Sequence, residues 1–157
     1  ILKGDRGTAF READHMLKNH RAIIRDLLNY ILSKGVTALD SVQYIHVGNR
    51  YPDTIVGIGA GMALSKLNRE KPILIMVEQA EDPSLTKVSL RTTEQMLAQG
   101  VDLQAAATTA SEKFGGAGGG HRIAAGAFIP RESEQEFVHH VNHVLAGQCT
   151  KQGAGHR

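Results

Sequence analysis

Residues 115–127 read Gly-Gly-Ala-Gly-Gly-Gly-His-Arg-Ile-Ala-Ala-Gly-Ala, and five of the first six are glycine. Glycine permits positive backbone φ angles and leaves the amide N–H groups unshielded by side chains. Successive bare amides can form a concave site for anionic oxygens, and the histidine that follows adds a donor that titrates near neutral pH. A flexible linker is the alternative, but the apolar residues that follow indicate ordered structure. We therefore interpret the run as a phosphate-binding loop.

A second candidate for anion binding is the segment Lys87-Val88-Ser89-Leu90-Arg91, which reads as a strand. In an extended chain Lys87, Ser89 and Arg91 point to one face, and the two apolar residues point to the other. An amine, a hydroxyl and a guanidinium in one row suit a phosphate. Taken alone, these residues fit an ordinary solvated strand face equally well.

The rest of the pattern predicts an α/β fold, with a mixed central sheet flanked by helices and preceded by a long N-terminal connector helix. Apolar spacing predicts that first helix over residues 8–34, ended by Gly35. Further strands are expected at residues 41–47, 72–77 and 127–130, and further helices at 53–67, 93–99, 102–114 and 133–147. The expected organisation is a connector helix at 1–36, a binding domain at 37–147 and a flexible tail at 148–157.

Three glycines fall inside the helix predicted to follow Pro52-Asp53, where Asp53 is the expected N-cap. Gly57, Gly59 and Gly61 each lower helix propensity by up to about 1 kcal/mol relative to alanine. Close packing of this helix on the sheet is the expected compensation. A dinucleotide-binding loop is rejected, because that fingerprint opens a helix directly after a buried strand.

Composition limits the class of protein. The chain has 157 residues, 41% of them hydrophobic and 22% charged, which is typical of one soluble globular domain. No apolar run approaches the roughly 20 residues of a membrane span, so no membrane association is expected. One cysteine excludes an internal disulfide and fits a cytoplasmic location. The net charge of +2 is compatible with a polyanionic partner but does not require one.

Three histidines lie close together in the last predicted helix. His139 and His143 are four residues apart, and His140 lies three before His143, so a metal pair on one helix face is geometrically possible. We expect an exposed, histidine-rich helix surface and no metal or other cofactor bound by this chain.

Three motifs carry a family resemblance. Gly118-Gly119-Gly120-His121, followed by residues 124–127, resembles the Gly-Gly-Gly-His signature of the DHH phosphoesterase superfamily, where it marks the smaller C-terminal DHH-associated domain. Residues 87–91 resemble the Lys-Val-Ser-x-Arg strand of RecJ-like exonucleases and oligonucleotide phosphatases. Residues 52–61 are similar to a helix start of the same domain. The motifs extend from Val42 to Leu145 in the family's order, and the likeness is greatest to archaeal RecJ-like proteins.

The resemblance implies a role in a metal-dependent phosphodiesterase or exonuclease, a hydrolase of nucleic acid. It assigns substrate phosphate to Gly118, Gly119, Gly120 and His121, together with Arg91, Ser89 and Lys87. The Mn²⁺ or Mg²⁺ ions would belong to a separate DHH catalytic domain upstream, since no Asp-His-His motif occurs here and no catalytic residue is expected in this chain. The expected partners are single-stranded DNA or RNA, that catalytic domain, and a replication or repair complex.

Two alternatives stay open. One is a non-catalytic nucleic-acid or replication-complex binding module that keeps the fold without a nuclease. The other is a domain like the C-terminal domain of alanyl-tRNA synthetases, which recognises tRNA; the histidine after Gly120 favours the phosphoesterases. With three Tyr, four Phe and no Trp, the chain gives little sign of a base-stacking platform, so recognition of the phosphate backbone is expected.

Overall fold

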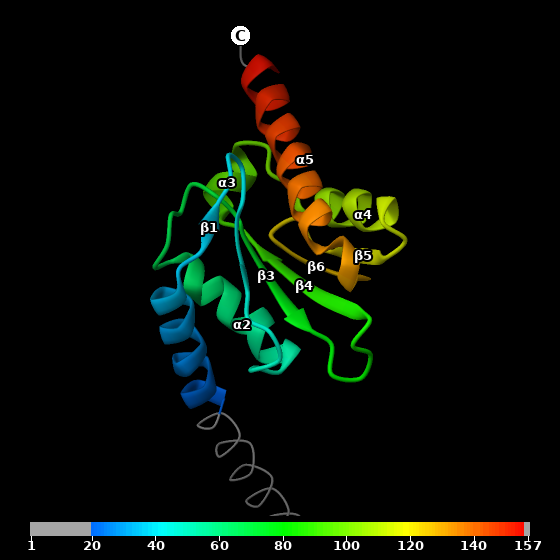
Figure 1. Cartoon of the computed structure of the whole chain (residues 1–157). Helices are drawn as coiled ribbons and strands as arrows, with labels where there is room; N and C mark the ends of the chain where they lie inside the picture. Colours follow the sequence, from blue (N-terminus) through cyan, green and yellow to red (C-terminus); the bar gives the residue numbers. More distant parts are fainter. Residues whose placement is uncertain (1–19, 156–157) are drawn as a thin grey trace, which may run out of the picture.

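The computed structural model describes residues 20–155, with side chains up to Cys149, and builds them around one mixed sheet. The strand order is β1-β2-β3-β4-β6-β5 (Figure 1). β2 and β3 pair in parallel, and the other neighbours in this sheet pair antiparallel. The strands are β1 (Thr37–Ala38), β2 (Gln43–His46), β3 (Ile73–Glu78), β4 (Leu85–Arg91), β5 (Ala117–Gly120) and β6 (Ala124–Pro130).

Helices cover the two faces of the sheet unevenly. The N-terminal helix, described from residue 20 to 34, lies beside α2 (Asp53–Leu64), and α2 packs on β3 and β4 (Figure 1). On the opposite face α4 (Leu103–Lys113) packs on β5 and β6, and α5 (Glu134–Gly155) packs on α4. The short α3 (Glu94–Ala98) follows β4, and a 3-10 turn (Arg131–Ser133) precedes α5.

The core is centred on β3. Its residues Ile73 to Val77 are all buried, as expected for a strand with structure on both of its faces. Burial alternates along β6, and along β4 it alternates except at the buried Ser89, so each of these strands has one buried face and one more accessible face. That accessible face is where the candidate site lies.

Most predicted elements are confirmed. The first helix ends at Gly35, which has a φ of +82° and donates its N–H to Ile31 O at 2.8 Å; residues 8–19 of the prediction lie outside the described residues. The dinucleotide-loop interpretation fails as expected, because Gly57 and Gly59 lie within α2. Asp102 caps α4, accepting from Ala105 N–H at 3.1 Å.

Several boundaries were predicted wrongly. β6 begins at Ala124, three residues earlier than expected, and Pro52 is the N-cap of α2. α5 does not end at Gly147 but continues to Gly155. Just after Gly147, the Gln148 side chain accepts a hydrogen bond from Asp102 N–H at 2.8 Å and donates one to Asp102 O at 3.0 Å, which attaches this part of α5 to the start of α4.

A partly buried hydrogen bond attaches the N-terminal helix to the loop before α2. Tyr51, 6% exposed, donates its hydroxyl to Asp26 Oδ2 at 2.6 Å. Burial, and then the bond to Asp26, raise the pKa of Tyr51 from 10.0 to about 12. Because the folded-state pKa is raised, this contribution to stability is present below pH 10 and is lost as the pH rises toward 12.

The packing of α2 against the N-terminal helix can be tested with two glycines of α2. Gly61→Ala should raise the free energy of unfolding by roughly 0.5–1 kcal/mol, because alanine favours helix and the added Cβ meets nothing within 4 Å. At Gly59 the added Cβ would lie 2.6 Å from Leu27 Cδ2, and overpacking costs about 1–3 kcal/mol. We expect Gly59→Ala to be less stable than Gly61→Ala by more than about 1 kcal/mol in urea unfolding. Equal stabilities would contradict the close packing.

Candidate functional site

Lys87, Ser89 and Arg91 are alternate residues of β4, as the sequence predicted, and the face that they share lies toward α2. A Cβ built on Gly57 of α2 would lie 3.6 Å from Arg91 Nη2 and 3.9 Å from Ser89 Oγ. The alternate residue Thr86 faces the other way and donates to Glu134 of α5 at 2.6 Å. The two faces of β4 are therefore chemically distinct.

This row opens into a hollow of about 340 Å³ between α2 and the sheet. The first turn of α2 borders it, and amides at a helix N-terminus favour bound anions. The Asp53 carboxylate also lies there, so one negative charge is already at its edge. The lining residues are Asp53, Thr54, Gly57 and Ile58 of α2, Lys87, Ser89 and Arg91 of β4, and Ala125 and Gly126 of β6.

Arg91 and Ser89 are well fixed for binding. Ser89 is only 4% exposed, and Arg91 Nη1 donates to Leu90 O at 3.0 Å. Burial lowers the pKa of Arg91 from its usual value, which is so high that the guanidinium stays charged at neutral pH. A half-buried, permanent cation with free donors suits a multivalent anion.

The glycine run is not a loop. Residues Ala117–Gly120 form the edge strand β5, antiparallel to β6, and this part of the prediction was wrong. The reason is packing: a Cβ on Gly118 would lie 2.6 Å from Ala107 O and 2.7 Å from Ser111 Oγ, so the bare strand fits closely against α4.

The hydrogen bonds between β5 and β6 determine which backbone amides of the glycine run remain available to bind a ligand. His121 N–H donates to Ala124 O at 2.8 Å, and Gly119 is paired with Gly126. Because bonded pairs alternate in an antiparallel ladder, the amides of Gly119 and His121 point to β6, and those of Gly118 and Gly120 point away from it. Any contribution of His121 to an anion site would therefore come from its exposed side chain.

A second hollow of about 330 Å³ adjoins the first over β5 and β6. The two share Lys87 and Gly126, so we treat them as one depression and call it the glycine groove. The second hollow is lined by Lys87, Ala117, Gly118, Gly119, Gly126, Ala127 and Phe128.

The groove gathers five of the seven predicted site residues. Lys87, Ser89 and Arg91 lie together, and Gly118 and Gly119 border the adjoining hollow. Gly120 and His121 lie at the hairpin beyond its lining. The sequence prediction missed the contributions of Gly57, Gly126 and Phe128 to the groove. Gly57 carried a signal as a glycine inside a helical pattern and Gly126 as part of the motif at residues 124–127, whereas Phe128 carried none.

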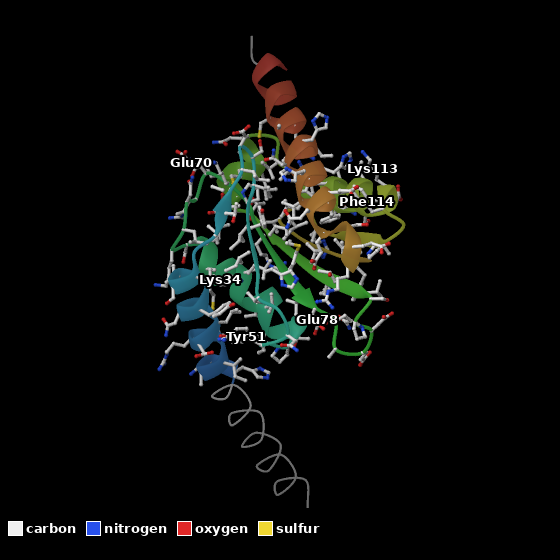
Figure 2. All side chains as sticks on the ribbon, viewed as in Figure 1. Lys34, Tyr51, Glu70, Glu78, Lys113 and Phe114 are labelled. Carbon is white, nitrogen blue, oxygen red and sulfur yellow. The ribbon has the colours of Figure 1, made fainter. Side chains whose placement is uncertain are left out.

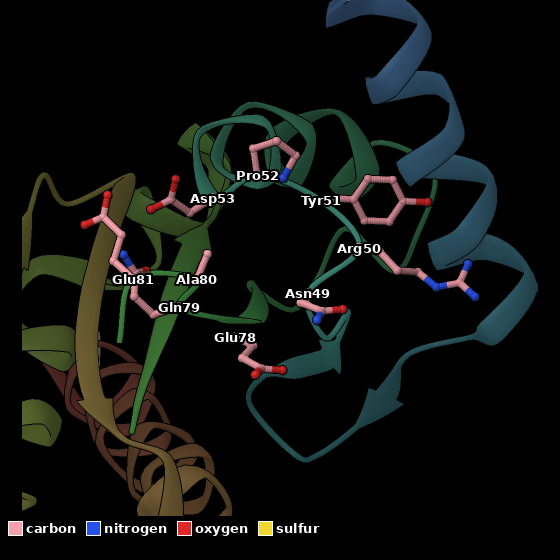
Figure 3. A pocket seen from close by; sticks show the side chains of 9 residues that line it. All are labelled: Asn49, Arg50, Tyr51, Pro52, Asp53, Glu78, Gln79, Ala80 and Glu81. Atoms are coloured by element: carbon pink, nitrogen blue, oxygen red, sulfur yellow. The ribbon is translucent and has the colours of Figure 1, made fainter. Parts of the chain in front are cut away.

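Two other hollows lie in the described structure. One, of about 450 Å³, lies between the loop before α2 and the loop after β3, where Asp53, Glu78 and Glu81 give it a carboxylate lining (Figure 3). The other is lined by Glu136, His139, His140 and His143 of α5 and by Lys113 and Phe114 at the end of α4. Figure 2 labels Lys113 and Phe114. Among the residues the structure describes, no group of three or more His, Cys, Asp or Glu is placed to hold a metal ion.

The fold and motifs correspond to a known family. The model of the DHHA1 domain matches residues 39–147, and the chain belongs to this family of DHH-associated, RecJ-like domains. It is 27% identical over 127 residues to an uncharacterised protein of Methanocaldococcus jannaschii, MJ0831; the match covers 81% of this chain and 27% of that protein.

Solved structures share the fold. RecJ of Thermus thermophilus in complex with Mg²⁺ has a TM-score of 0.65 at 16% identity, covering 86% of this chain and 19% of RecJ. The C-Ala domain of Aquifex aeolicus alanyl-tRNA synthetase has a TM-score of 0.56 at 12% identity, covering 71% of this chain and 97% of that domain. The chain thus spans about a fifth to a quarter of RecJ and MJ0831. In the described part of the chain, every helix is too short or too polar to cross a membrane.

The strand conformation of the glycine run predicts a contrast between neighbouring glycines. Gly118→Ala should lower the free energy of unfolding by about 1–3 kcal/mol, because its Cβ would collide with the α4 backbone. Gly119→Ala should change it by less than about 0.5 kcal/mol, because nothing lies within 4 Å of the added Cβ. Denaturant unfolding of both variants tests this. Equal tolerance at the two positions would instead indicate an unpacked loop.

Proposed function

We propose that this chain is the substrate-binding domain of a RecJ-like DHH phosphoesterase and that it positions a phosphate of single-stranded nucleic acid in the glycine groove. The observation that carries this is the row of Lys87, Ser89 and Arg91, set beside the first turn of α2 in a hollow of suitable size. The membership of the DHHA1 family supports it, since such domains accompany DHH catalytic domains in RecJ-like proteins.

In this role the chain's own groups hold the phosphate. Arg91 offers a planar pair of donors, Ser89 a neutral hydroxyl, and Lys87 a mobile ammonium. The outward amides of Gly118 and Gly120 and the exposed imidazole of His121 lie at the neighbouring edge and can bind an adjacent phosphate. The Asp53 carboxylate repels anions, so the site favours ligands whose negative charge is attracted to the cationic row strongly enough to overcome this repulsion.

The hydrolytic chemistry would come from elsewhere. Mn²⁺ or Mg²⁺ ions held by a separate DHH domain would supply the activated water. Fixed cationic donors that hold a phosphate in register with such a centre contribute through positioning and charge stabilisation. The 157-residue chain by itself is expected to bind oligonucleotides without cleaving them.

The phosphate site can be tested by comparing 5′-phosphorylated and 5′-hydroxyl single-stranded hexanucleotides, DNA and RNA, in fluorescence anisotropy. We expect the wild-type chain to prefer the phosphorylated strand about tenfold or more at low salt, because charge-assisted bonds to a desolvated guanidinium are strong. Arg91→Gln should abolish that preference and reduce the salt dependence of binding by about one phosphate contact.

Arg131→Gln is a matched control, because Arg131 pairs with Glu78 outside the groove. It should keep the wild-type preference. Equal affinity of the wild-type chain for the two strands would exclude a 5′-terminal phosphate from the groove, and unchanged affinity of Arg91→Gln for both strands would overturn the phosphate site. Binding with the phosphate preference but no hydrolysis when the chain is joined to a DHH domain would instead favour a non-catalytic nucleic-acid binding module.

A further inference from the structure

Building on the proposed function, we infer that the second hollow of the glycine groove holds a nucleobase, stacked on Phe128, while the phosphate of the same nucleotide occupies the first hollow. Phe128 is 37% exposed, although its neighbours Ala127 and Ile129 in β6 are buried. An exposed aromatic ring beside an anion site is the arrangement that nucleotides use in single-strand binding.

The floor beneath this ring is bare backbone. Gly119 of β5 is the register partner of Gly126 of β6, so neither strand places a side chain there. A Cβ on Gly119 would meet nothing within 4 Å, which shows that the space above it is open. At Gly126 an added Cβ would lie 3.1 Å from Lys87 Nζ, so the Lys87 side chain covers that part of the floor, and the open space that suits a planar heterocycle lies over Gly119.

The register sets the distance between the two subsites. Ser89 pairs with Gly126 and Lys87 pairs with Phe128, so Phe128 lies opposite Lys87, one alternate step along the sheet from Ser89. Two residues of a strand span roughly 7 Å, a separation that one sugar can bridge between its phosphate and its base.

Lys87 connects the two subsites. It lines both hollows, and its Nζ lies over the Phe128 ring, 4.5 Å from the centroid. A phosphate next to Ser89 offers the ammonium a stronger partner than an exposed ring does. Binding the phosphate would therefore draw Lys87 toward the first hollow and leave the ring to the base.

Base identity should matter little. The lining of the second hollow is glycine and alanine apart from Lys87 and Phe128, so it offers few side-chain donors or acceptors to read a base edge. Stacking tolerates any base. The base must however be unpaired, which would make Phe128 a determinant of single-strand preference.

The test compares ligands that differ in the base alone. A 5′-phosphorylated hexanucleotide is measured against the same strand with an abasic first residue, and adenosine 5′-monophosphate against ribose 5-phosphate. We expect the base to strengthen binding to the wild-type chain about tenfold. A preference in the hexanucleotide pair identifies a strand end as the source of the base, and a preference in the monophosphate pair alone identifies a free nucleotide.

Three variants test whether the preference for the base depends on Phe128 and on the open space over Gly119. Phe128→Leu should lose the preference for the base while keeping the preference for the 5′-phosphate. Gly119→Val should do the same by filling the hollow, since nothing in the free protein opposes its Cβ and valine suits a strand. Gly147→Ala, also open at Cβ but on α5, should behave as wild type.

The outcomes distinguish the two claims. Equal binding of base-containing and abasic ligands by the wild-type chain would overturn the base site and leave the phosphate site standing. Retention of the base preference in Phe128→Leu would also overturn it. Failure of every phosphorylated ligand to bind would overturn both sites.

Discussion

The alternation of β4 is the constraint on which the site depends. Val88 and Leu90 are wholly buried on the face that also carries Thr86, whose hydroxyl binds Glu134 of α5. Moving the strand by one residue would bury Lys87 and Arg91 in that core, so the register is strongly fixed. Burial of Val88 and Leu90 on the opposite face therefore keeps the cationic row directed toward α2. Because one face of β4 is packed in the core, the hydrogen-bond donors on its other face have little freedom to move.

Glycines divide into two roles around this strand. Gly59 and Gly118 allow close packing, against Leu27 and the α4 backbone respectively. Gly119 instead leaves open space over β5, and Gly57 leaves the side of α2 that faces Arg91 without a side chain. The same residue type thus brings the helices close and keeps the groove open. This explains how helix α2 tolerates residues that weaken it as an isolated helix.

Local patterns in the sequence predicted the strands β2, β3 and β4, the helices and the cap at Asp102, because each depends on neighbouring residues. They did not predict that the glycine run is a strand, because β5 forms only through pairing with β6 and contact with α4. They also did not predict that α5 continues past Gly147, where Gln148 bonds the backbone of Asp102, 46 residues away. The row of Lys87, Ser89 and Arg91 was predicted from alternation along one strand. The places of Gly126 and Phe128 in the groove depend on the register in which β6 pairs with β4 and β5, which no local pattern predicts.

Amide and arginine side-chain NMR spectra of the 157-residue chain, recorded during titration with a 5′-phosphorylated single-stranded oligonucleotide, would locate the ligand most directly. Binding in the glycine groove predicts the largest shifts at Ser89, the Arg91 Nε–H, Gly119 and Gly126, with little change at His139 to His143. Shifts concentrated on the histidines of α5 or on the carboxylate-lined hollow, with Arg91 unmoved, would contradict it.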